Sequence, residues 1–469
     1  MSLKNLAMAT PERKTIAIIG AAIAGPTLAL HILSHPILRT RYRPLLFDAA
    51  PAPGTDPSRR LRAGASVCLF ASGIFPLRHL GLDAAISARG FECDDVVVWQ
   101  GAERLNAQRR AMRSRELDTG VWYFERSELQ ALLLEKLAEI GGEDVGWRKK
   151  ATGFEQVDGR MKVDFDDGTD VSADILVGAD GGYSAVRRHI LQTRNPATAE
   201  ERWLPDFMGM TGIYGVSDAA ETTSATAAFA DTHAIWLDRG FLATGPCPAG
   251  RTRWDLIIPE AQPPPAHKAA AGALKPKRDV PPWSSNILPS QYPLADTIAM
   301  LEKHEHVPHP YAGTLGDLVR SADRIIHTPL RQRVWRAEEI QAGNAVLIGD
   351  ASRLLLPTSG SGTGFAVEDA TVLADLLVKY ADADDGLRLA LEEYAQLRVP
   401  RSSKMAAMSN LAGRFALGEA WYYRFLRYYM YKWMPSKEYH KDGSKPGKDP
   451  WPVDARYTIR DAPGEGAAK

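Results

Sequence analysis

The chain lacks a surplus of either charge, because Lys+Arg and Asp+Glu both number 57. A protein without a basic surplus carries no electrostatic signature of nucleic-acid or anionic-membrane binding, and we predict no nucleic-acid partner. It also lacks any uninterrupted apolar run of about 18 residues, so no transmembrane helix is expected. No internal repeat is visible, and the C-terminus carries no prenylation or retention signal.

Cysteine is scarce. Cys68, Cys93 and Cys247 lie far apart and form no CxxC pair. This spacing argues against a disulfide framework and fits a reducing compartment, so we predict a cytoplasmic protein. At 469 residues the chain is long enough for two or three domains with sizeable cores.

The most informative stretch is Thr15–Gly25. Its first five residues suit a buried parallel strand, and a helical pattern follows Gly25. Strand, glycine turn and helix form the first unit of a dinucleotide-binding fold, in which a pyrophosphate lies on the helix N-terminus. Gly20 would make the tight turn and Gly25 the close helix–strand contact. Ala22 occupies the position of the middle glycine, where a methyl group takes room from the pyrophosphate.

Two other readings of this stretch are a buried strand–helix pair without a ligand and a signal peptide. The signal peptide is suggested by Arg13 and Lys14, which precede a mostly apolar segment. A second strand, Arg43–Asp48, ends in an acid 23 residues after Gly25, where a carboxylate binds ribose hydroxyls in the dinucleotide fold. The alternative for Asp48 is a helix or turn cap.

Two further strands end in glycine turns with a carboxylate. One runs from Asp174 to Asp180 and Gly181, and the other ends at Gly349 and Asp350. A glycine-rich loop follows the latter, before a long helix expected to begin near Phe365. One extended ligand with a pyrophosphate and several sugar or ribityl hydroxyls would use this arrangement.

In these motifs the sequence resembles the single-component FAD-dependent aromatic hydroxylases, which are salicylate hydroxylase-like flavoprotein monooxygenases. The resemblance covers roughly residues 14–400. The second family motif is matched by Asp174, Gly178, Asp180, Gly181, Ser184 and Arg187, and the third by Gly349, Asp350, Pro357, Gly360, Gly362, Glu368, Asp369 and Ala370. Arg126 matches an arginine that contacts the flavin in this family.

The resemblance implies FAD as the cofactor. Asp350 would bind the ribityl chain, and the helix starting near Gly364 would direct its N-terminus at the N1/C2 carbonyl edge of the flavin. Asp180 and Arg187 would lie near the pyrophosphate, in a motif that also serves NAD(P)H. The full set of expected cofactor-binding residues is Gly20, Ala22, Ala24, Gly25, Asp48, Arg126, Asp180, Gly181, Arg187, Gly349, Asp350, Pro357, Gly360, Gly362, Thr363 and Gly364.

The chain departs from the family pattern at four positions. Arg353 stands where His is usual and Ser361 where Gln is usual, while Ala22 and Asp48 replace the commoner Gly and Glu. These positions lie near the phosphates or the flavin, so they bear on the orientation and affinity of the cofactor. The alternative for Asp180 and Asp350 is a turn or N-cap role.

We therefore predict an α/β fold: a Rossmann-like FAD-binding domain with a parallel sheet, interrupted by a mostly antiparallel substrate-binding sheet and followed by C-terminal helices. The expected division is a tail over 1–12, the FAD-binding domain over 13–200 (with some substrate-domain strands near 91–125), and the substrate-binding domain over 201–330. The FAD-binding domain returns over 331–400, and a helical region and tail occupy 401–469. Ser127 and Gln130 predict a capping box for a leucine-rich helix.

The implied activity is NADPH- or NADH-dependent hydroxylation of an electron-rich aromatic or heteroaromatic small molecule, such as a secondary metabolite, by a flavin C4a-hydroperoxide formed from O₂. The alternatives are a flavin epoxidase, oxidase or reductase on the same fold, and a non-redox FAD-binding protein. Candidates for substrate contacts are Tyr214, His233, Trp236 and Arg239 in the predicted substrate sheet, with Pro357. No obligatory protein nucleophile is expected, and the sequence leaves monomer and homodimer open.

Two further groups of residues, one rich in histidine and one rich in aromatic residues, lie outside these motifs. His304, His306 and His309 could bind a metal, but Pro308 and Pro310 break any helix that would align them, so we favour a solvated loop and no metal. The aromatic, basic stretch 414–434 could lie on a membrane surface or form a partner interface. A packed pair of C-terminal helices is the favoured interpretation of that stretch.

Overall fold

The computed structural model describes residues 12–55, 66–114, 117–218, 231–264, 280–310, 313–436 and 459–463. The expected N-terminal tail falls outside these residues except for Glu12. Most of the expected C-terminal tail beyond 436 also falls outside them.

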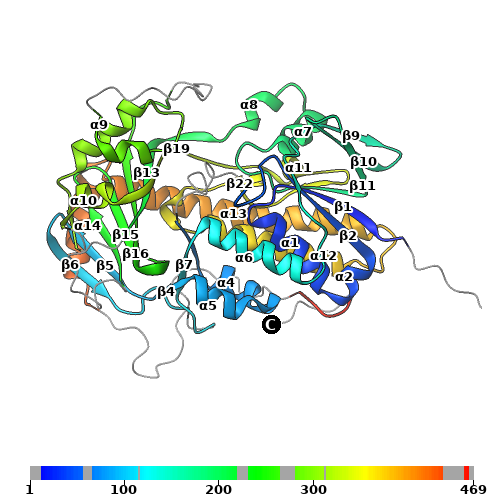
Figure 1. Cartoon of the computed structure of the whole chain (residues 1–469), viewed down its shortest axis with the longest axis horizontal. Coiled ribbons are helices and arrows are strands. Elements are labelled where there is room, and N and C mark those ends of the chain that lie inside the picture. Colours follow the sequence, from blue (N-terminus) through cyan, green and yellow to red (C-terminus); the bar gives the residue numbers. More distant parts are fainter. Residues whose placement is uncertain are drawn as a thin grey trace, which may run out of the picture.

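A six-stranded sheet forms the centre of the first domain, here called the Rossmann-like domain (Figure 1). In spatial order its strands are β20 (Gln341–Ala342), β21 (Ala345–Leu347), β12 (Ile175–Gly178), β1 (Lys14–Ile19), β2 (Tyr42–Asp48) and β8 (Gly146–Trp147). β1 lies in the middle, parallel to both β2 and β12. Its residues Ile16–Ile19 are buried because both faces of the sheet are covered. The interpretation of Thr15–Gly25 as a signal peptide is therefore wrong, because Lys14–Ile19 forms a central strand of the folded sheet.

Helices surround this sheet. They are α1 (Ala24–Ser34), α2 (Pro36–Arg41), α4 (Ala71–Leu77), α5 (Asp83–Arg89), α6 (Arg126–Glu139), α7 (Ala185–Arg194), α8 (Ala199–Trp203), α11 (Ala337–Ile340) and α12 (Gly362–Lys379). α1 packs against β2, α6 and α12, while a π-helical turn over Arg78–Leu82 joins α4 to α5. A small antiparallel sheet of β11 (Asp170–Ala173), β10 (Arg160–Phe165) and β9 (Ala151–Val157) contacts β1, β12 and α7.

The second domain, here called the sheet domain, is built on an eight-stranded sheet. Its order is β22 (Arg353–Leu354), β19 (Ala322–Val334), β13 (Asp206–Ser217), β16 (Arg251–Pro259), β15 (Phe241–Cys247), β14 (Thr232–Trp236), β5 (Val96–Gln100) and β6 (Glu103–Gln108). All neighbours pair antiparallel except β14 and β5. The fold class predicted from the sequence is confirmed. The strands β5 and β6, which come from residues 96–108, belong to this sheet.

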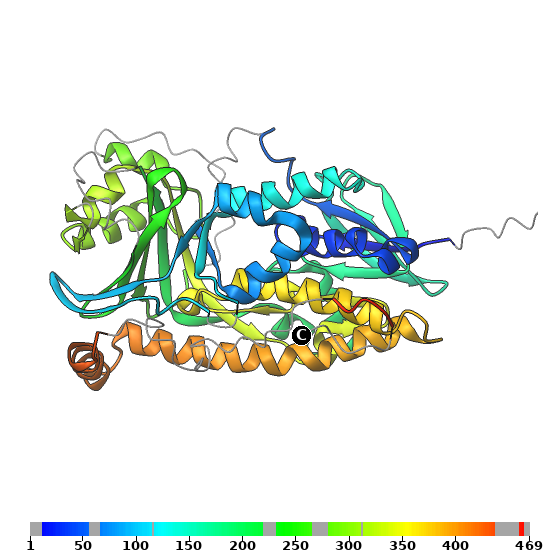
Figure 2. The same cartoon turned by 90° about the horizontal axis from the view of Figure 1, so that it is seen from below.

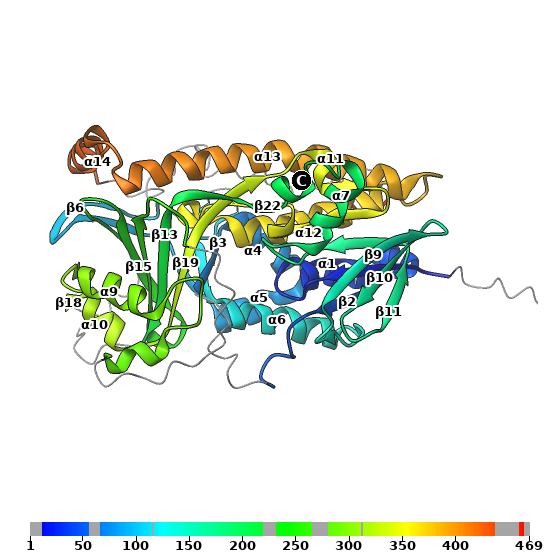
Figure 3. The same cartoon turned by 90° about the horizontal axis from the view of Figure 1, so that it is seen from above.

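One face of the eight-stranded sheet is covered by α9 (Leu294–His304) and α10 (Leu315–Arg320), with the short strands β17 (Pro308–His309) and β18 (Gly313–Thr314) between them. Because side chains alternate along a strand, Trp254 and Leu256 of β16 pack into the apolar core under these helices. Arg253 and Asp255 then share the opposite face. The long strand β19 extends to the edge strand β22 of this sheet, near the Rossmann-like domain (Figure 3).

The long helix α13 (Gly386–Leu417) runs along one side of the molecule, and α14 (Trp421–Trp433) lies across its end (Figure 2). α13 continues without a break across the domain boundary expected at 400. α14 packs on the sheet domain through Arg427, which is 1% exposed and donates to the carbonyl of Leu237 after β14. Arg427 also donates to the carbonyl of Ala416 in α13 at 2.7 Å. Its outer face leaves Trp421 and Trp433 exposed. No described helix is long and apolar enough to cross a membrane.

Replacing Gly20 with Ala tests the first turn. Gly20 has φ of +113°, and a Cβ there would meet the carbonyl oxygen of Ala179 at 2.2 Å. We expect Gly20→Ala to lower the free energy of unfolding by about 3 kcal/mol or more, measured by urea denaturation. Gly54→Ala is the control, because Gly54 also has positive φ (+79°) but has open space around it. That control should cost only about 1 kcal/mol, and equal losses would contradict the steric account.

Candidate cofactor and substrate site

A cavity of about 520 Å³ lies where the two domains meet. On the Rossmann-like side it is lined by residues of all three predicted glycine turns. On the sheet-domain side it is lined by Tyr214, Arg253, Asp255, Ile326 and Thr328. The fold therefore brings together turns that are separated by more than half of the sequence.

The first turn is held between β1 and β2. The backbone N–H of Gly20 donates to the carbonyl of Phe47 at 2.7 Å, and Ala22 and Ala24 line the cavity. Asp48 accepts from the backbone N–H of Ala21 at 2.8 Å and from Ala50 at 2.7 Å. These are the contacts of a turn cap, and they fix the turn to the end of β2. A ribose contact of Asp48 stays a prediction.

Gln130 also secures this turn, in a way that the sequence did not indicate. α6 begins at Arg126 without a side-chain cap, so the predicted capping box of Ser127 and Gln130 is wrong. The Gln130 side chain instead donates to the carbonyl of Ala21 at 2.6 Å. Tertiary contact with the glycine turn has taken the side chain away from its own helix terminus.

The second turn carries a buried carboxylate. Asp180 accepts from the first-turn N–H groups of α7, at 2.7 Å from Ala185 and 3.2 Å from Val186. Its other oxygen, Oδ1, is buried with no hydrogen-bond partner in the described structure. Burial raises the pKa of this carboxyl, which the hydrogen bonds partly offset. Gly181 lines the cavity beside it.

Arg187 does not face the cavity, contrary to its expected place near the pyrophosphate. It is fully buried and stacks on Trp335 with its guanidinium carbon 3.8 Å from the ring centre. Its guanidinium donates to the carbonyls of Trp203, Gly182 and Ala351, at 3.0, 2.5 and 2.9 Å. Arg187 thus ties the second turn to the third as a structural residue.

The third turn depends on Asp369. The backbone N–H of Gly349, which has φ of +62°, donates to Asp369 Oδ2 at 2.8 Å. Arg398 donates to the other oxygen at 2.6 Å, and Arg353 also bonds the carboxylate. Burial opposes the charge, but Arg353 and Arg398 outweigh it and hold the pKa of Asp369 below its usual range.

This network gives a structural role to Arg353, which stands where the family that the sequence resembles usually has histidine. Arg353 is 2% exposed and packs over Phe365, with 4.8 Å between its guanidinium carbon and the ring centre. It bonds Asp369 beneath the turn and does not line the cavity. Glu368 completes the network by accepting from Arg398 at 2.9 Å and from Arg401 at 2.7 Å.

The N-terminus of α12 opens on the cavity. The helix begins at Gly362, slightly earlier than predicted, and the residue before it, Ser361, makes no side-chain cap. Gly362 and Thr363 line the cavity, whereas a Cβ on Gly73 would meet the Cα of Gly364 at 2.9 Å. Unpartnered N–H groups and the dipole of a long helix favour negative charge at this point. No acidic side chain lies in the first turn to compete for it.

Asp350 and Arg126 supply the charged groups of the cofactor side. Both line the cavity, and within the described residues neither has a hydrogen-bond or ion-pair partner. Burial raises the pKa of Asp350, while Arg353 and Arg126 lower it. A free carboxylate, a free guanidinium, a helix N-terminus and three glycine turns fit a ligand that carries hydroxyls, phosphates and an electron-poor ring, as FAD does.

Of the predicted substrate contacts, Tyr214 and Pro357 line the cavity. Trp236 instead packs among Phe241, Phe415 and Tyr431 in an apolar cluster, and Arg239 is exposed at the β14–β15 turn. His233 is buried and accepts from Trp99 at 2.9 Å. None of these three lines the cavity. They lie in or just after β14, which β15 separates from the cavity-lining strand β16.

Sequence reasoning missed Arg253 and Asp255. The signal was present, because β16 reads Arg-Thr-Arg-Trp-Asp-Leu-Ile-Ile and places charges at alternate positions of an otherwise buried strand. Such alternation puts both charges on one face of the sheet. The sequence alone does not tell which face of the sheet borders the cavity. The structure shows it, because helices α9 and α10 cover the opposite face.

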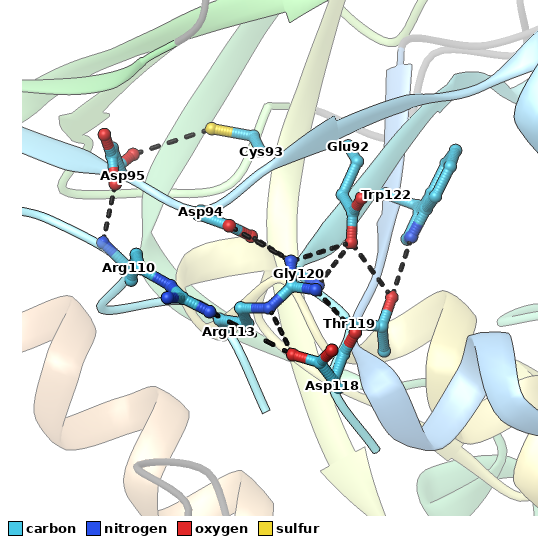
Figure 4. Close-up of polar contacts among 10 residues, drawn as sticks. All are labelled: Glu92, Cys93, Asp94, Asp95, Arg110, Arg113, Asp118, Thr119, Gly120 and Trp122. Carbon is cyan, nitrogen blue, oxygen red and sulfur yellow. Dashed lines mark hydrogen bonds and ion pairs between the residues drawn. The ribbon is translucent and has the colours of Figure 1, made fainter. Parts of the chain in front are cut away.

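A polar cluster fixes the strand β7 (Val121–Glu125), which carries the cavity residue Tyr123 (Figure 4). β7 pairs with β3 (Ser66–Leu69) and β4 (Phe91–Cys93). Glu92 accepts from the backbone of Gly120 at 2.7 Å, and Arg113 bridges Asp94 and Asp118 at 3.1 and 2.8 Å. These contacts join the loop before β7 to the segment that enters the sheet domain.

The histidine segment is not a solvated loop throughout. His309 is buried, and its Nε2 lies 2.8 Å from Thr244 Oγ1. Burial lowers its pKa to about 3, with a smaller contribution from His233. Among the residues that the structure describes, no three His, Cys, Asp or Glu side chains are grouped to hold a metal ion.

The Asp369 network generates a stability prediction. Asp369→Asn would leave Arg353 and Arg398 buried with less compensating charge, so we expect a loss of about 3–5 kcal/mol in the free energy of unfolding. The pKa of Asp369 in the folded protein is lowered below its usual range. The ionised carboxylate therefore stabilises the fold at neutral pH, and this stabilisation is lost as the pH falls through the pKa of the folded state. Urea denaturation at several pH values measures both.

Asp382→Asn is the matched control, since Asp382 pairs with Arg41 at the surface with 64% of its side chain exposed. Its removal should change stability by less than about 1 kcal/mol. Similar losses for the two variants would show that the buried network does not hold the third turn.

Comparison with known proteins supports the assignment of an FAD-binding fold to this chain. A family model described as an FAD binding domain matches residues 74–225 and 316–409, which is more than half of the chain. Salicylate hydroxylase of Pseudomonas putida is 29% identical over 84% of each chain. Aurachin C monooxygenase/isomerase of Stigmatella aurantiaca is 27% identical over 86% of this chain and 90% of its own.

Solved structures show the same fold. HpxO of Klebsiella pneumoniae, complexed with FAD and uric acid, has a TM-score of 0.69 at 19% identity, covering 91% of this chain and 95% of its own. 2,6-Dihydroxypyridine-3-hydroxylase of Arthrobacter nicotinovorans has a TM-score of 0.64 at 18% identity, covering 87% and 94%. The chain belongs to the FAD-dependent aromatic hydroxylase family of flavoprotein monooxygenases.

Proposed function

We propose that this FAD-dependent monooxygenase consumes NADPH or NADH and hydroxylates an electron-rich aromatic or heteroaromatic small molecule. The observation that carries the proposal is the shared cavity, which has a cofactor wall of glycine turns and a polar wall formed by the sheet domain. The relatives whose names specify hydroxylation of salicylate, 6-methylsalicylate and 3-amino-4-hydroxybenzoate support an aromatic substrate.

The bound flavin would supply the redox chemistry, taking electrons from NAD(P)H and passing one atom of O₂ to the substrate. The residues of this chain position it. Asp350 would accept hydrogen bonds from the ribityl hydroxyls, Arg126 would donate to the flavin, and Gly362 and Thr363 would present the N-terminus of α12 to it. The positive end of this helix would stabilise negative charge on the cofactor and so favour its reduced state.

The apolar part of the cavity lining would exclude water from the reacting atoms. Its apolar wall includes Leu355, Leu356 and Ile326. Cys68 also lines it, and burial raises the pKa of the thiol to about 11, so the thiol stays protonated at neutral pH. The free thiols of Cys68, Cys93 and Cys247 are consistent with the cytoplasmic location predicted from the sequence.

The test is NAD(P)H oxidation by the FAD-loaded protein under O₂, screened over phenols, indoles, pyridines and polyketide aromatics with product analysis. We expect at least one aromatic to stimulate oxidation and to gain a hydroxyl group. Oxidation without an oxygenated product would favour an oxidase or reductase. No stimulation by any aromatic, from a protein that binds FAD, would contradict the hydroxylase proposal.

Asp350→Asn tests the cofactor wall. It removes a charged acceptor that has no partner among the described residues, so we expect the Kd for FAD to rise about tenfold or more, measured by fluorescence titration of the apoprotein. Asp384→Asn is the control, because Asp384 is exposed and is not among the residues that line the cavity. Unchanged FAD affinity in Asp350→Asn would remove Asp350 from the cofactor site.

A further inference from the structure

The polar wall of the cavity contains a buried ion pair on one strand. Arg253 and Asp255 lie two positions apart on β16, so both project from the face that lines the cavity. Arg253 Nη1 donates to Asp255 Oδ2 at 3.0 Å. The arginine is only 5% exposed. A charge this deeply buried is tolerated because the neighbouring carboxylate compensates it.

Arg253 is fixed from its other sides. Its guanidinium carbon lies 4.0 Å from the ring centre of Tyr123, and Nη2 lies 3.5 Å from Thr232 Oγ1. Nε is buried without a hydrogen-bond partner. The cation is therefore held in one place with Asp255 as its charged partner.

Asp255 has acceptor capacity left. Only its Oδ2 is bonded within the described structure, and the 21% of its side chain that is exposed belongs to a residue of the cavity lining. Its cross-strand neighbours are Tyr214 on β13 and Ala243 on β15. Burial raises the pKa of Asp255, and Arg253 lowers it. Oδ1 is thus an unoccupied acceptor in a partly desolvated site.

We propose that Asp255 accepts a hydrogen bond from the substrate, and that its pairing with Arg253 selects a neutral ring bearing a hydroxyl or N–H donor over an aromatic carboxylate. This inference rests on the proposed function in one respect, namely that the sheet-domain end of the cavity holds the substrate. It assigns a ligand class that differs from the aromatic acids in the names of several relatives.

The negative charge of Asp255 is the reason for this selectivity. A ligand carboxylate that approached Arg253 would bring a second negative charge beside Asp255. Among the lining residues that the structure describes, the other arginine is Arg126, which interacts electrostatically with Asp350 on the Rossmann-like side. Cys68 and Tyr123 stay neutral, since burial raises their pKa values to about 11 and about 12. A neutral donor meets none of this repulsion.

The same contact suits the reaction. A ring hydroxyl that donates to a carboxylate gains electron density, which the ring passes to its reacting carbons. The adjacent guanidinium can donate to an acceptor next to that hydroxyl, such as a ring carbonyl. A hydroxylated heteroaromatic ring with neighbouring donor and acceptor groups fits this pair.

The experiment measures ligand binding to the FAD-loaded, oxidised protein without NAD(P)H, by the change in flavin absorbance. Matched pairs are used: 2-naphthol against 3-hydroxy-2-naphthoate, and 4-hydroxyquinoline against 4-hydroxyquinoline-2-carboxylate. We expect the neutral member of each pair to bind at least about tenfold more tightly. In Asp255→Asn the neutral member should bind about 10- to 100-fold more weakly while the acid binds more tightly.

Glu103→Gln is the control variant, because Glu103 is a carboxylate of the same sheet that lies at the surface and bonds Lys432. It should leave both affinities unchanged. The pH profile adds a readout that does not need a variant. In the wild type the neutral ligand should bind more weakly as the pH falls and Asp255 is protonated, and this slope should vanish in Asp255→Asn.

Acids that bind as tightly as their neutral partners, or neutral ligands that perturb no flavin absorbance, would overturn the inference. So would an unchanged ratio in a folded, FAD-loaded Asp255→Asn protein; if that variant does not fold, the wild-type ratio and pH profile decide. Failure of the proposed function has a different signature, in which neutral ligands bind preferentially but no NAD(P)H-dependent hydroxylated product forms.

Discussion

The site depends above all on the hydrogen bond from the backbone of Gly349 to the buried carboxylate of Asp369. This bond joins the third glycine turn to α12, whose N-terminus opens on the cavity. Arg353 and Arg398 keep the carboxylate ionised, so the acceptor is charged and strong. Because a buried carboxylate without these partners would be costly, the turn, the helix and the arginines form one cooperative unit.

Around this unit the chain builds a cavity with two different walls. The Rossmann-like domain presents backbone N–H groups together with Asp350 and Arg126, whose side chains have no partner among the described residues. The sheet domain presents Tyr214 and the Arg253–Asp255 pair. The first wall suits a dinucleotide, whereas the second suits a small polar ring.

Local sequence patterns predicted most of the cofactor wall, because glycine turns between a buried strand and a helix are specified by a few adjacent residues. These patterns did not predict side-chain positions that are set by contacts between residues far apart in the sequence. Gln130 leaves its helix to bond Ala21, and Arg187 is buried against Trp335 instead of facing a phosphate. The substrate wall was the least predictable part. Tyr214 was identified but Trp236 lies elsewhere, since the borders of a cavity depend on which sheet face the helices cover.

The most direct test of the account is hydroxylation of an aromatic substrate in an atmosphere of ¹⁸O₂, followed by mass spectrometry of the product. The account predicts that the new hydroxyl carries a single labelled oxygen and that its formation requires both FAD and NAD(P)H. A product oxygen derived from water, or product formation independent of FAD, would contradict the central claim that this cavity performs flavin-dependent monooxygenation.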